Sequence, residues 1–147
     1  MVEKFKFPAA CSTPLLSTVL EDDMRAPGRG VTQKHADKMV KIVRGLLEQK
    51  GMRNACVAVD CDGSRPHYML ECSPCITATR GANGGHYLTS KNRRMTTDEM
   101  LRLQGMSPNL VDKSILSNRQ LGEAIGNAMT QTVLQKMFKR LLLSMGL

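Results

Sequence analysis

The sequence predicts an α+β fold in which a small mixed domain of short strands and helices is followed by C-terminal helices. Three observations favour this class. Apolar residues recur with a helical period over residues 36–47, they contract into brief runs over residues 55–70, and a helix-capping pattern begins at residue 96. The chain has 147 residues, which suits one domain or a little more, because a domain usually holds about 100–200 residues.

Two helices separated by a loop are predicted in the first third of the chain. Ser12-Thr13-Pro14 is typical of a helix start and precedes a short apolar stripe. Charged residues followed by Ala-Pro-Gly-Arg-Gly predict a loop over residues 21–30. The second helix is expected to begin after its cap, Thr32, and to end at Gly51, the position of a C-terminal glycine. Its buried face would carry Ala36, Met39, Val40, Val43, Leu46 and Leu47.

Beyond Gly51 the pattern changes from helix to strand. Residues 55–59 and 67–70 are short apolar runs between turn-forming residues, which predicts two strands of a small antiparallel sheet. Residues 77–85 are polar and rich in glycine, which predicts a loop. Residues 86–89 form a further candidate strand.

Helical spacing returns in the last third of the chain. Thr96 and Glu99 form a capping-box pattern, and Gly105 is expected to end that helix after about two turns. A final helical region is expected from about Gln120, broken or recapped at Gly126-Asn127. Its last part carries an apolar face made of Val133, Leu134, Met137, Leu141 and Leu142.

The charge and the cysteines bound the class of protein. The formal net charge is +8, and residues 65–147 carry most of it, with eleven Lys or Arg against five acidic residues. Nucleic acid is the default partner for such a basic half, although many basic proteins only solvate their charges. The sequence has no apolar leader, no apolar run of about 18 residues, and an odd number of cysteines. We therefore expect a protein that is intracellular or has lost its signal, with reduced thiols and no membrane partner. It would be nuclear in a eukaryote and in the cytoplasm or nucleoid of a bacterium or phage.

Two sequence blocks near the C-terminus carry a family resemblance. Residues 93–105 read Arg-Arg-Met-Thr-Thr-Asp-Glu-Met-Leu-Arg-Leu-Gln-Gly, and residues 120–129 read Gln-Leu-Gly-Glu-Ala-Ile-Gly-Asn-Ala-Met. The pair resembles the last two blocks of DNA (cytosine-5)-methyltransferases, roughly Arg-x-Leu-Thr-x-x-Glu-x-x-Arg-Leu-Gln-Gly-Phe-Pro and Gln-x-x-x-x-Ile-Gly-Asn-Ala-Val. Residues 73–80, Ser-Pro-Cys-Ile-Thr-Ala-Thr-Arg, are similar to the family's Ser-Pro-Thr-Ile-Thr-Ala-Arg segment. The departures are methionines at positions 95, 106 and 129, and a proline one residue late at 108.

The resemblance implies a division of the chain and a missing part. Residues 1–92 would be the target-recognition, DNA-binding region, and residues 93–147 a helical segment that completes the catalytic domain by packing on a Rossmann-like sheet. The chain lacks the family's Phe-x-Gly-x-Gly cofactor loop and its Glu-Asn-Val and Gln-x-Arg-x-Arg blocks. It therefore resembles a C-terminal third, as one subunit of a split enzyme or a truncated product, inactive without an N-terminal methyltransferase fragment.

The resemblance and the basic residues together predict where DNA binds. Residues 91–94, Lys-Asn-Arg-Arg, lie beside the glycine-rich loop, so hydroxyls, backbone amides and guanidinium groups would line one strip suited to phosphates. Glycines would let a sugar-phosphate chain approach closely, and the alternative is an ordinary solvated surface. Residues 21–30 and 60–66 are candidate base-reading loops. The predicted contacts with double-stranded DNA are Thr77, Thr79, Arg80, Gly84, Gly85, Arg93 and Arg94.

The second block predicts one wall of an S-adenosylmethionine site. In the family the Gly-Asn-Ala turn abuts the cofactor loop, which implies cofactor-side roles for Gly126, Asn127, Ala128 and Met129. Backbone N–H groups at the start of the following helix would meet the cofactor's carboxylate. The alternative is that Gly126-Asn127 only recaps a helix, and both can hold together.

No catalytic residue is assigned to this chain. In the family a thiolate adds to C6 of a flipped cytosine, and C5 takes the methyl group. Pro74-Cys75 looks like that nucleophile, but Cys75 occupies the Thr position of the Ser-Pro-Thr-Ile-Thr segment and has no Glu-Asn-Val partner.

Two other functions remain open from the sequence. One is a non-catalytic DNA-binding or regulatory module derived from the family. The other is a small zinc protein with Cys56, Cys61, Cys72 and Cys75 as ligands. We expect no metal, because Cys56 alternates with apolar residues in a predicted strand, and because the histidines at 35, 67 and 86 are scattered.

Overall fold

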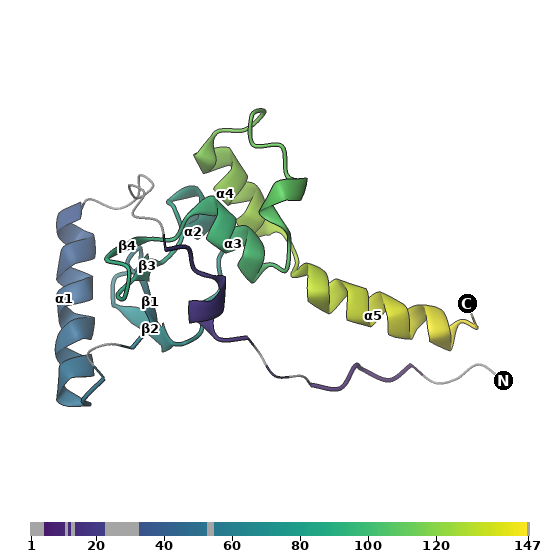
Figure 1. Cartoon of the computed structure of the whole chain (residues 1–147), viewed down its shortest axis with the longest axis horizontal. Coiled ribbons are helices and arrows are strands. Elements are labelled where there is room, and N and C mark those ends of the chain that lie inside the picture. Colours follow the sequence, from purple (N-terminus) through teal and green to yellow (C-terminus); the bar gives the residue numbers. More distant parts are fainter. Residues whose placement is uncertain (1–4, 11, 13, 23–32, 53–54, 147) are drawn as a thin grey trace.

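The computed structural model describes residues 5–10, 12, 14–22, 33–52 and 55–146. It is an α+β domain in which helices surround a small four-stranded sheet (Figure 1). The elements, in chain order, are η1 (Leu16–Val19, a 3₁₀ turn), α1 (Gln33–Gln49), β1 (Val57–Asp60), β2 (His67–Leu70), α2 (Ala78–Ala82), β3 (Tyr87–Leu88), β4 (Arg93–Arg94), α3 (Thr97–Leu103), η2 (Pro108–Leu110, a 3₁₀ turn), α4 (Asn118–Asn127) and α5 (Gln131–Ser144). The predicted fold class is confirmed.

The sheet is antiparallel, with strand order β2-β1-β3-β4. Val59 of the central strand β1 pairs with Tyr68 of β2 on one side and Tyr87 of β3 on the other. Successive side chains of a strand point to opposite faces, so β1 contributes to two cores. Val57 and Val59 pack against α1, whereas Ala58 packs in a core that Leu101 of α3 and Leu121 of α4 also line. Figure 1 shows α1 on one side of the sheet, and α2, α3 and α4 on the other.

The strand predictions hold in outline. The predicted strand at 67–70 matches β2, while the strands predicted at 55–59 and 86–89 are shifted or shortened to β1 and β3. Strand β4 was not predicted, because a two-residue strand leaves no periodic pattern. The loop predicted over residues 77–85 is wrong in part: α2 lies there, begun by Thr77, whose hydroxyl accepts the N–H of Arg80 at 3.4 Å.

Helix boundaries follow their caps. The capping box of Thr96 and Glu99 begins α3 as predicted. A second one, with Ser117 as the cap and Gln120 as its partner, begins α4 slightly before the expected start. The helix expected after Ser12-Thr13-Pro14 is only the turn η1, while Thr13, Thr32 and most of the loop at 21–30 lie outside the described residues.

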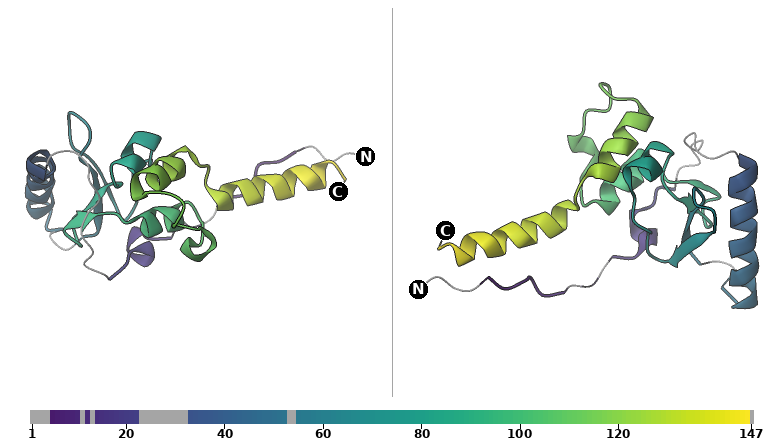
Figure 2. Two further views of the ribbon diagram at one scale, coloured as in Figure 1. Left: turned by 90° about the horizontal axis from the view of Figure 1, so that it is seen from above. Right: turned by 180° about the vertical axis from the view of Figure 1, so that it is seen from behind.

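The break predicted at Gly126-Asn127 is confirmed, because α4 ends there and α5 begins at Gln131. Helix α5 projects away from the body of the domain, and residues 5–10 extend in the same direction beside it (Figures 1 and 2). Among the described residues, none of the helices has the length and apolar character needed to cross a membrane.

Candidate functional site

Helices α2 and α4 cross in direct contact at their glycines. A Cβ atom added at Gly81 would overlap the carbonyl oxygen of Gly122, and one added at Gly122 would overlap that of Gly81. Near the end of α4, a Cβ atom added at Gly126 would overlap the carbonyl oxygen of Thr77. Only glycine permits such close backbone contact. The N-terminus of α2 is therefore packed against the last turn of α4.

This packing brings together two groups of residues that the sequence assigns to different tasks. Thr77 and Thr79, predicted to contact DNA, are exposed at the start of α2. Asn127 and Met129, predicted to face the cofactor, are exposed at the end of α4, and Met129 is 63% exposed. The two groups are neighbours at one end of the α2–α4 pair, 50 residues apart in the chain (127 − 77 = 50).

Arg80 and the loop between β1 and β2 form the next part of this surface. The Nε atom of Arg80 donates to Oδ2 of Asp60 at 3.1 Å. Burial works to raise the pKa of Asp60, but hydrogen bonds from the N–H of Asp62 and from Arg80 outweigh it and hold the pKa below its usual value. Ser64 and Arg65, within a predicted base-reading loop, are exposed. The loop therefore exposes the cationic side chain of Arg65, while the ion pair between Asp60 and Arg80 anchors the start of the loop to α2.

Arg93 and Arg94 are turned inward, which corrects the prediction that they contact DNA. Their exposed fractions are 5% and 4%. Arg93 forms a bidentate pair with Glu99 at 2.7 and 2.8 Å, and Arg94 donates to Asp62 at 2.9 Å and to the Gly85 carbonyl at 2.6 Å. Both guanidinium groups are therefore internal ion-pair partners.

The other members of the predicted cationic run are also engaged. Lys91 pairs with Asp22 at 2.8 Å, and the side-chain oxygen of Asn92 accepts hydrogen bonds from Arg44 and Tyr87. The run at 91–94 is a structural hairpin between β3 and β4, not a free cationic strip.

The glycines of the predicted DNA loop approach protein atoms. Gly85 is buried, and a Cβ atom added there would lie 2.9 Å from Sδ of Met100. Gly84 is half-buried with φ of 89°. The atoms that lie close to Gly85 therefore belong to the core of the domain. The prediction that this glycine lets a sugar-phosphate chain approach is wrong.

A buried network that the sequence did not predict joins the N-terminal segment to α3. Glu21 donates its N–H to Oε1 of Glu99 at 2.8 Å, and its own carboxylate accepts from Thr96 and Arg102. Burial tends to raise the pKa of Glu99, but the hydrogen bonds from Arg93 and from the N–H groups of Glu21 and Thr96 outweigh it and lower that pKa. The spacing of Arg93 and Glu99 was visible in the sequence, but their long-range partner was not.

Residues 126–129, predicted to face the cofactor, connect α4 to α5, and Gln104 forms hydrogen bonds on both sides of this turn. Gln131, at the start of α5, donates its N–H to the carbonyl of Gln104 at 2.8 Å. The side chain of Gln104 accepts the hydroxyl of Thr130 at 2.9 Å and donates to the carbonyl of Ile125 at 3.3 Å. These bonds hold the turn at 126–129 so that Asn127 and Met129 remain exposed.

No protein-family model, curated protein or solved structure matches the chain. These comparisons therefore show no family for this chain.

The cysteines do not gather into a metal site in the described part of the chain. No group of three or more His, Cys, Asp or Glu side chains there is arranged to hold a metal ion. Cys56 and Cys61 are buried, Cys72 is half-buried and Cys75 is exposed, while Cys11 lies outside the described residues. Burial raises the pKa of the Cys61 thiol to about 11 and also raises that of Cys56, so these two are inert core thiols at neutral pH.

The three histidines differ in burial and in their hydrogen bonds. His86 is buried, and its Nε2 atom lies 3.1 Å from the carbonyl oxygen of Pro74, so this nitrogen carries the proton. Burial lowers the pKa of His86 and keeps the ring neutral. His35 lies 3.3 Å from the carbonyl oxygen of Gly63, and His67 is exposed on β2. His86 is a structural residue that holds the segment before α2 against β3.

Proposed function

We propose that this chain is the target-recognition and C-terminal part of a DNA (cytosine-5)-methyltransferase. It docks double-stranded DNA and completes the S-adenosylmethionine site of a catalytic portion that carries the nucleophile. The proposal extends to an intracellular location at the DNA, in a nucleus or a nucleoid. The observation that supports it most is the contact between α2 and α4, which sets exposed Thr77 and Thr79 beside exposed Asn127 and Met129.

The adjacency matters because methyl transfer needs DNA and cofactor at one place. A flipped base has to reach the methyl donor, so groups that bind phosphates and groups that line the cofactor must be neighbours. Two motif segments of one family, remote in sequence, meet at one end of a helix pair. Thr77, Thr79 and Arg65 are the exposed candidates for DNA contact, and Arg80 is a half-buried candidate paired with Asp60, while Arg93 and Arg94 serve the fold.

Helix α5 provides a second line of support. It projects from the body and leaves large apolar side chains in solvent, among them Val133, Leu141 and Leu142 at 51%, 42% and 46% exposed. These are residues of the face that the resemblance assigns to packing on a Rossmann-like sheet. An exposed apolar helix face of this kind marks an interaction site.

The test is reconstitution of methyl transfer from two polypeptides. The chain is mixed with an N-terminal methyltransferase fragment that carries the cofactor loop, the Pro-Cys nucleophile and the Glu-Asn-Val and Gln-x-Arg-x-Arg blocks. Transfer of labelled methyl groups from S-adenosylmethionine to duplex DNA is expected for the mixture and for neither part alone. A mixture that binds DNA without transfer would favour the non-catalytic module instead.

The same experiment examines the cofactor wall through Asn127→Asp. A carboxylate beside that of S-adenosylmethionine repels it, so cofactor affinity of the reconstituted pair should fall by about tenfold, the effect of roughly 1.4 kcal/mol. The matched control is Asn109→Asp, an exposed asparagine in η2 that receives the same added charge. Equal affinities for the two variants, measured by calorimetry, would leave Asn127 as a helix-terminal residue only.

A further inference from the structure

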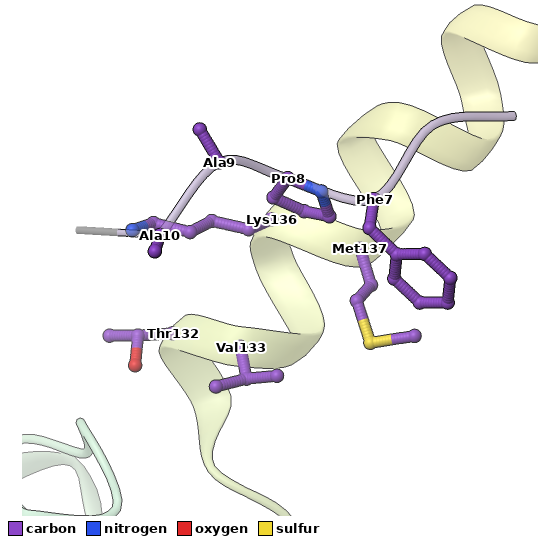
Figure 3. A pocket seen from close by; sticks show the side chains of 8 residues that line it. All are labelled: Phe7, Pro8, Ala9, Ala10, Thr132, Val133, Lys136 and Met137. Carbon is purple, nitrogen blue, oxygen red and sulfur yellow. The ribbon is translucent and has the colours of Figure 1, made fainter.

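The described N-terminal segment and α5 enclose an apolar groove. Figure 3 shows residues 7–10 running alongside α5, with the side chains of Val133 and Met137 on the helix side of the gap. The groove has a volume of about 280 Å³. Its lining residues are Phe7, Pro8, Ala9, Ala10, Thr132, Val133, Lys136 and Met137.

The groove's size and lining favour a side chain over a small-molecule ligand. Pockets for drug-sized ligands hold about 300–1,000 Å³ and are mostly apolar, with a small number of placed polar groups. At about 280 Å³ this groove is just below that range, and Thr132 and Lys136 are its two polar side chains. One large apolar side chain seated between two chain segments is the usual centre of a protein interface.

The basic residues next to the groove indicate the charge of the protein surface that would bind there. Arg140 and Lys139 follow the groove residues Lys136 and Met137 by three or four positions, so they lie one turn further along the helix surface. Both are exposed. Residues 131–147 contain no Asp or Glu, so the whole helix is cationic. A partner surface with complementary charge would present carboxylates to this helix.

We propose that this groove receives one large apolar side chain of the catalytic portion, from a segment whose carboxylates face Lys139 and Arg140. The inference rests on the proposed function, since it names the surface through which the two portions bind. The occupant is the catalytic portion because α5 follows the turn at 126–129 directly, so that a partner contacting this turn also reaches the start of α5. Residues 7–10 are then part of the interface.

The groove is tested by filling it. Ala10→Trp places an indole between the two segments. The control is Gln49→Trp, which places the same indole at an exposed position of α1, on the opposite side of the domain. Binding to the N-terminal methyltransferase fragment is measured by calorimetry on the full chain. Ala10→Trp should weaken binding by at least about tenfold, the loss typical of an anchor residue. Gln49→Trp should bind like the unaltered chain.

The charges are tested by reversal. The double variant Lys139→Glu/Arg140→Glu should weaken binding by about tenfold at low salt and less at high salt, because exposed charge pairs are screened. The control Lys38→Glu/Lys41→Glu reverses two exposed lysines on α1, at the opposite side of the domain, and should not change binding.

The outcomes separate the two proposals. If the unaltered chain does not bind the fragment, both fail. If it binds and restores methyl transfer, but Ala10→Trp and the α5 reversal behave like their controls, the groove inference fails and the proposed function stands. Thermal melts of each variant show whether a weakened affinity reflects lost folding.

Discussion

At the scale of single residues, the motif at 93–105 is a set of structural contacts. Arg93 and Glu99 pair inside the domain, Thr96 caps α3, and Arg102 reaches Glu21. A pair of charges withdrawn from water is stable only when each group is matched and its remaining hydrogen bonds are filled. Glu21 fills those bonds from a segment more than 70 residues away (93 − 21 = 72).

Arg93→Ala should therefore destabilise the fold and not act as a loss of DNA contact. Removing the cation leaves Glu99 buried without its partner, a change that costs about 3–5 kcal/mol in the free energy of unfolding. Urea denaturation measures it. The matched variant Arg65→Ala removes an exposed arginine and should change stability by no more than about 0.5 kcal/mol. Equal stabilities of the two variants would contradict the internal role of Arg93.

The sequence alone could not show that Arg65 is exposed and Arg93 is buried. Both are arginines near glycines and turns, and burial is decided by partners distant in the chain. Asp62 pairs with Arg94, and the carbonyl of Glu21 completes the contacts that Arg93 makes with the nearby Glu99. No local pattern connects Asp62 or Glu21 to residues 93 and 94. By contrast, Thr96 and Glu99 act within one helical turn, so their roles were visible.

At the scale of elements, glycines determine how α2 and α4 meet. Gly81 and Gly122 remove the side chains that would hold the two backbones apart. The short helix α2 buries little apolar surface of its own, so its place depends on this contact. The exposed threonines at 77 and 79 are positioned by the same crossing.

Gly81→Ala should destabilise the domain by about 1–3 kcal/mol, because the added methyl group forces the backbones of α2 and α4 apart. The control is Gly45→Ala in α1, where a Cβ atom has no neighbour within 4 Å. That change should stabilise by about 0.5–1 kcal/mol, since alanine favours the helix over glycine. Thermal denaturation of both variants measures the contrast, and a neutral Gly81→Ala would show that the crossing tolerates separation.

Elements with a sustained period were predictable, and elements fixed by contacts were not. The helix α1, the strand β2 and the capped helices α3 and α4 follow from spacing and end signals. Helix α2 did not, because its glycines indicate a loop until Gly122 is known to lie against them. The strand β4 depends on pairing with β3 and has no pattern of its own.

At the scale of the whole molecule, apolar surface gathers on the part that projects from the body. Phe138 and Leu143 of α5 are 56% and 53% exposed, and Phe7 beside it is 77% exposed. A soluble monomer rarely leaves an apolar patch of more than a few hundred Å² uncovered. The body itself has two filled cores.

The isolated chain should therefore self-associate as its concentration rises. Phe138→Asp/Leu142→Asp places two charges on the exposed face of α5 and should shift the chain toward the monomer, because burying an unpaired charge is costly. Sedimentation velocity over a range of concentrations measures the shift. Ile115→Asp/Leu116→Asp, in the exposed segment before α4, is the control and should leave self-association unchanged. A monomeric unaltered chain at high concentration would contradict the expectation.

The three hydrogen bonds that join Gln104 to Ile125, Thr130 and Gln131 also hold the direction in which α5 leaves the body of the domain. Helix α5 has 14 residues, and with a rise of 1.5 Å per residue its axis is about 21 Å long. A rotation of about 10° at the junction would move the far end of such a rod by about 4 Å, roughly the separation of two carbon atoms in van der Waals contact. A substitution of Gln104 removes the two bonds made by its side chain, while its carbonyl still accepts the N–H of Gln131. Such a change would alter the direction of α5 without altering any residue on the helix itself.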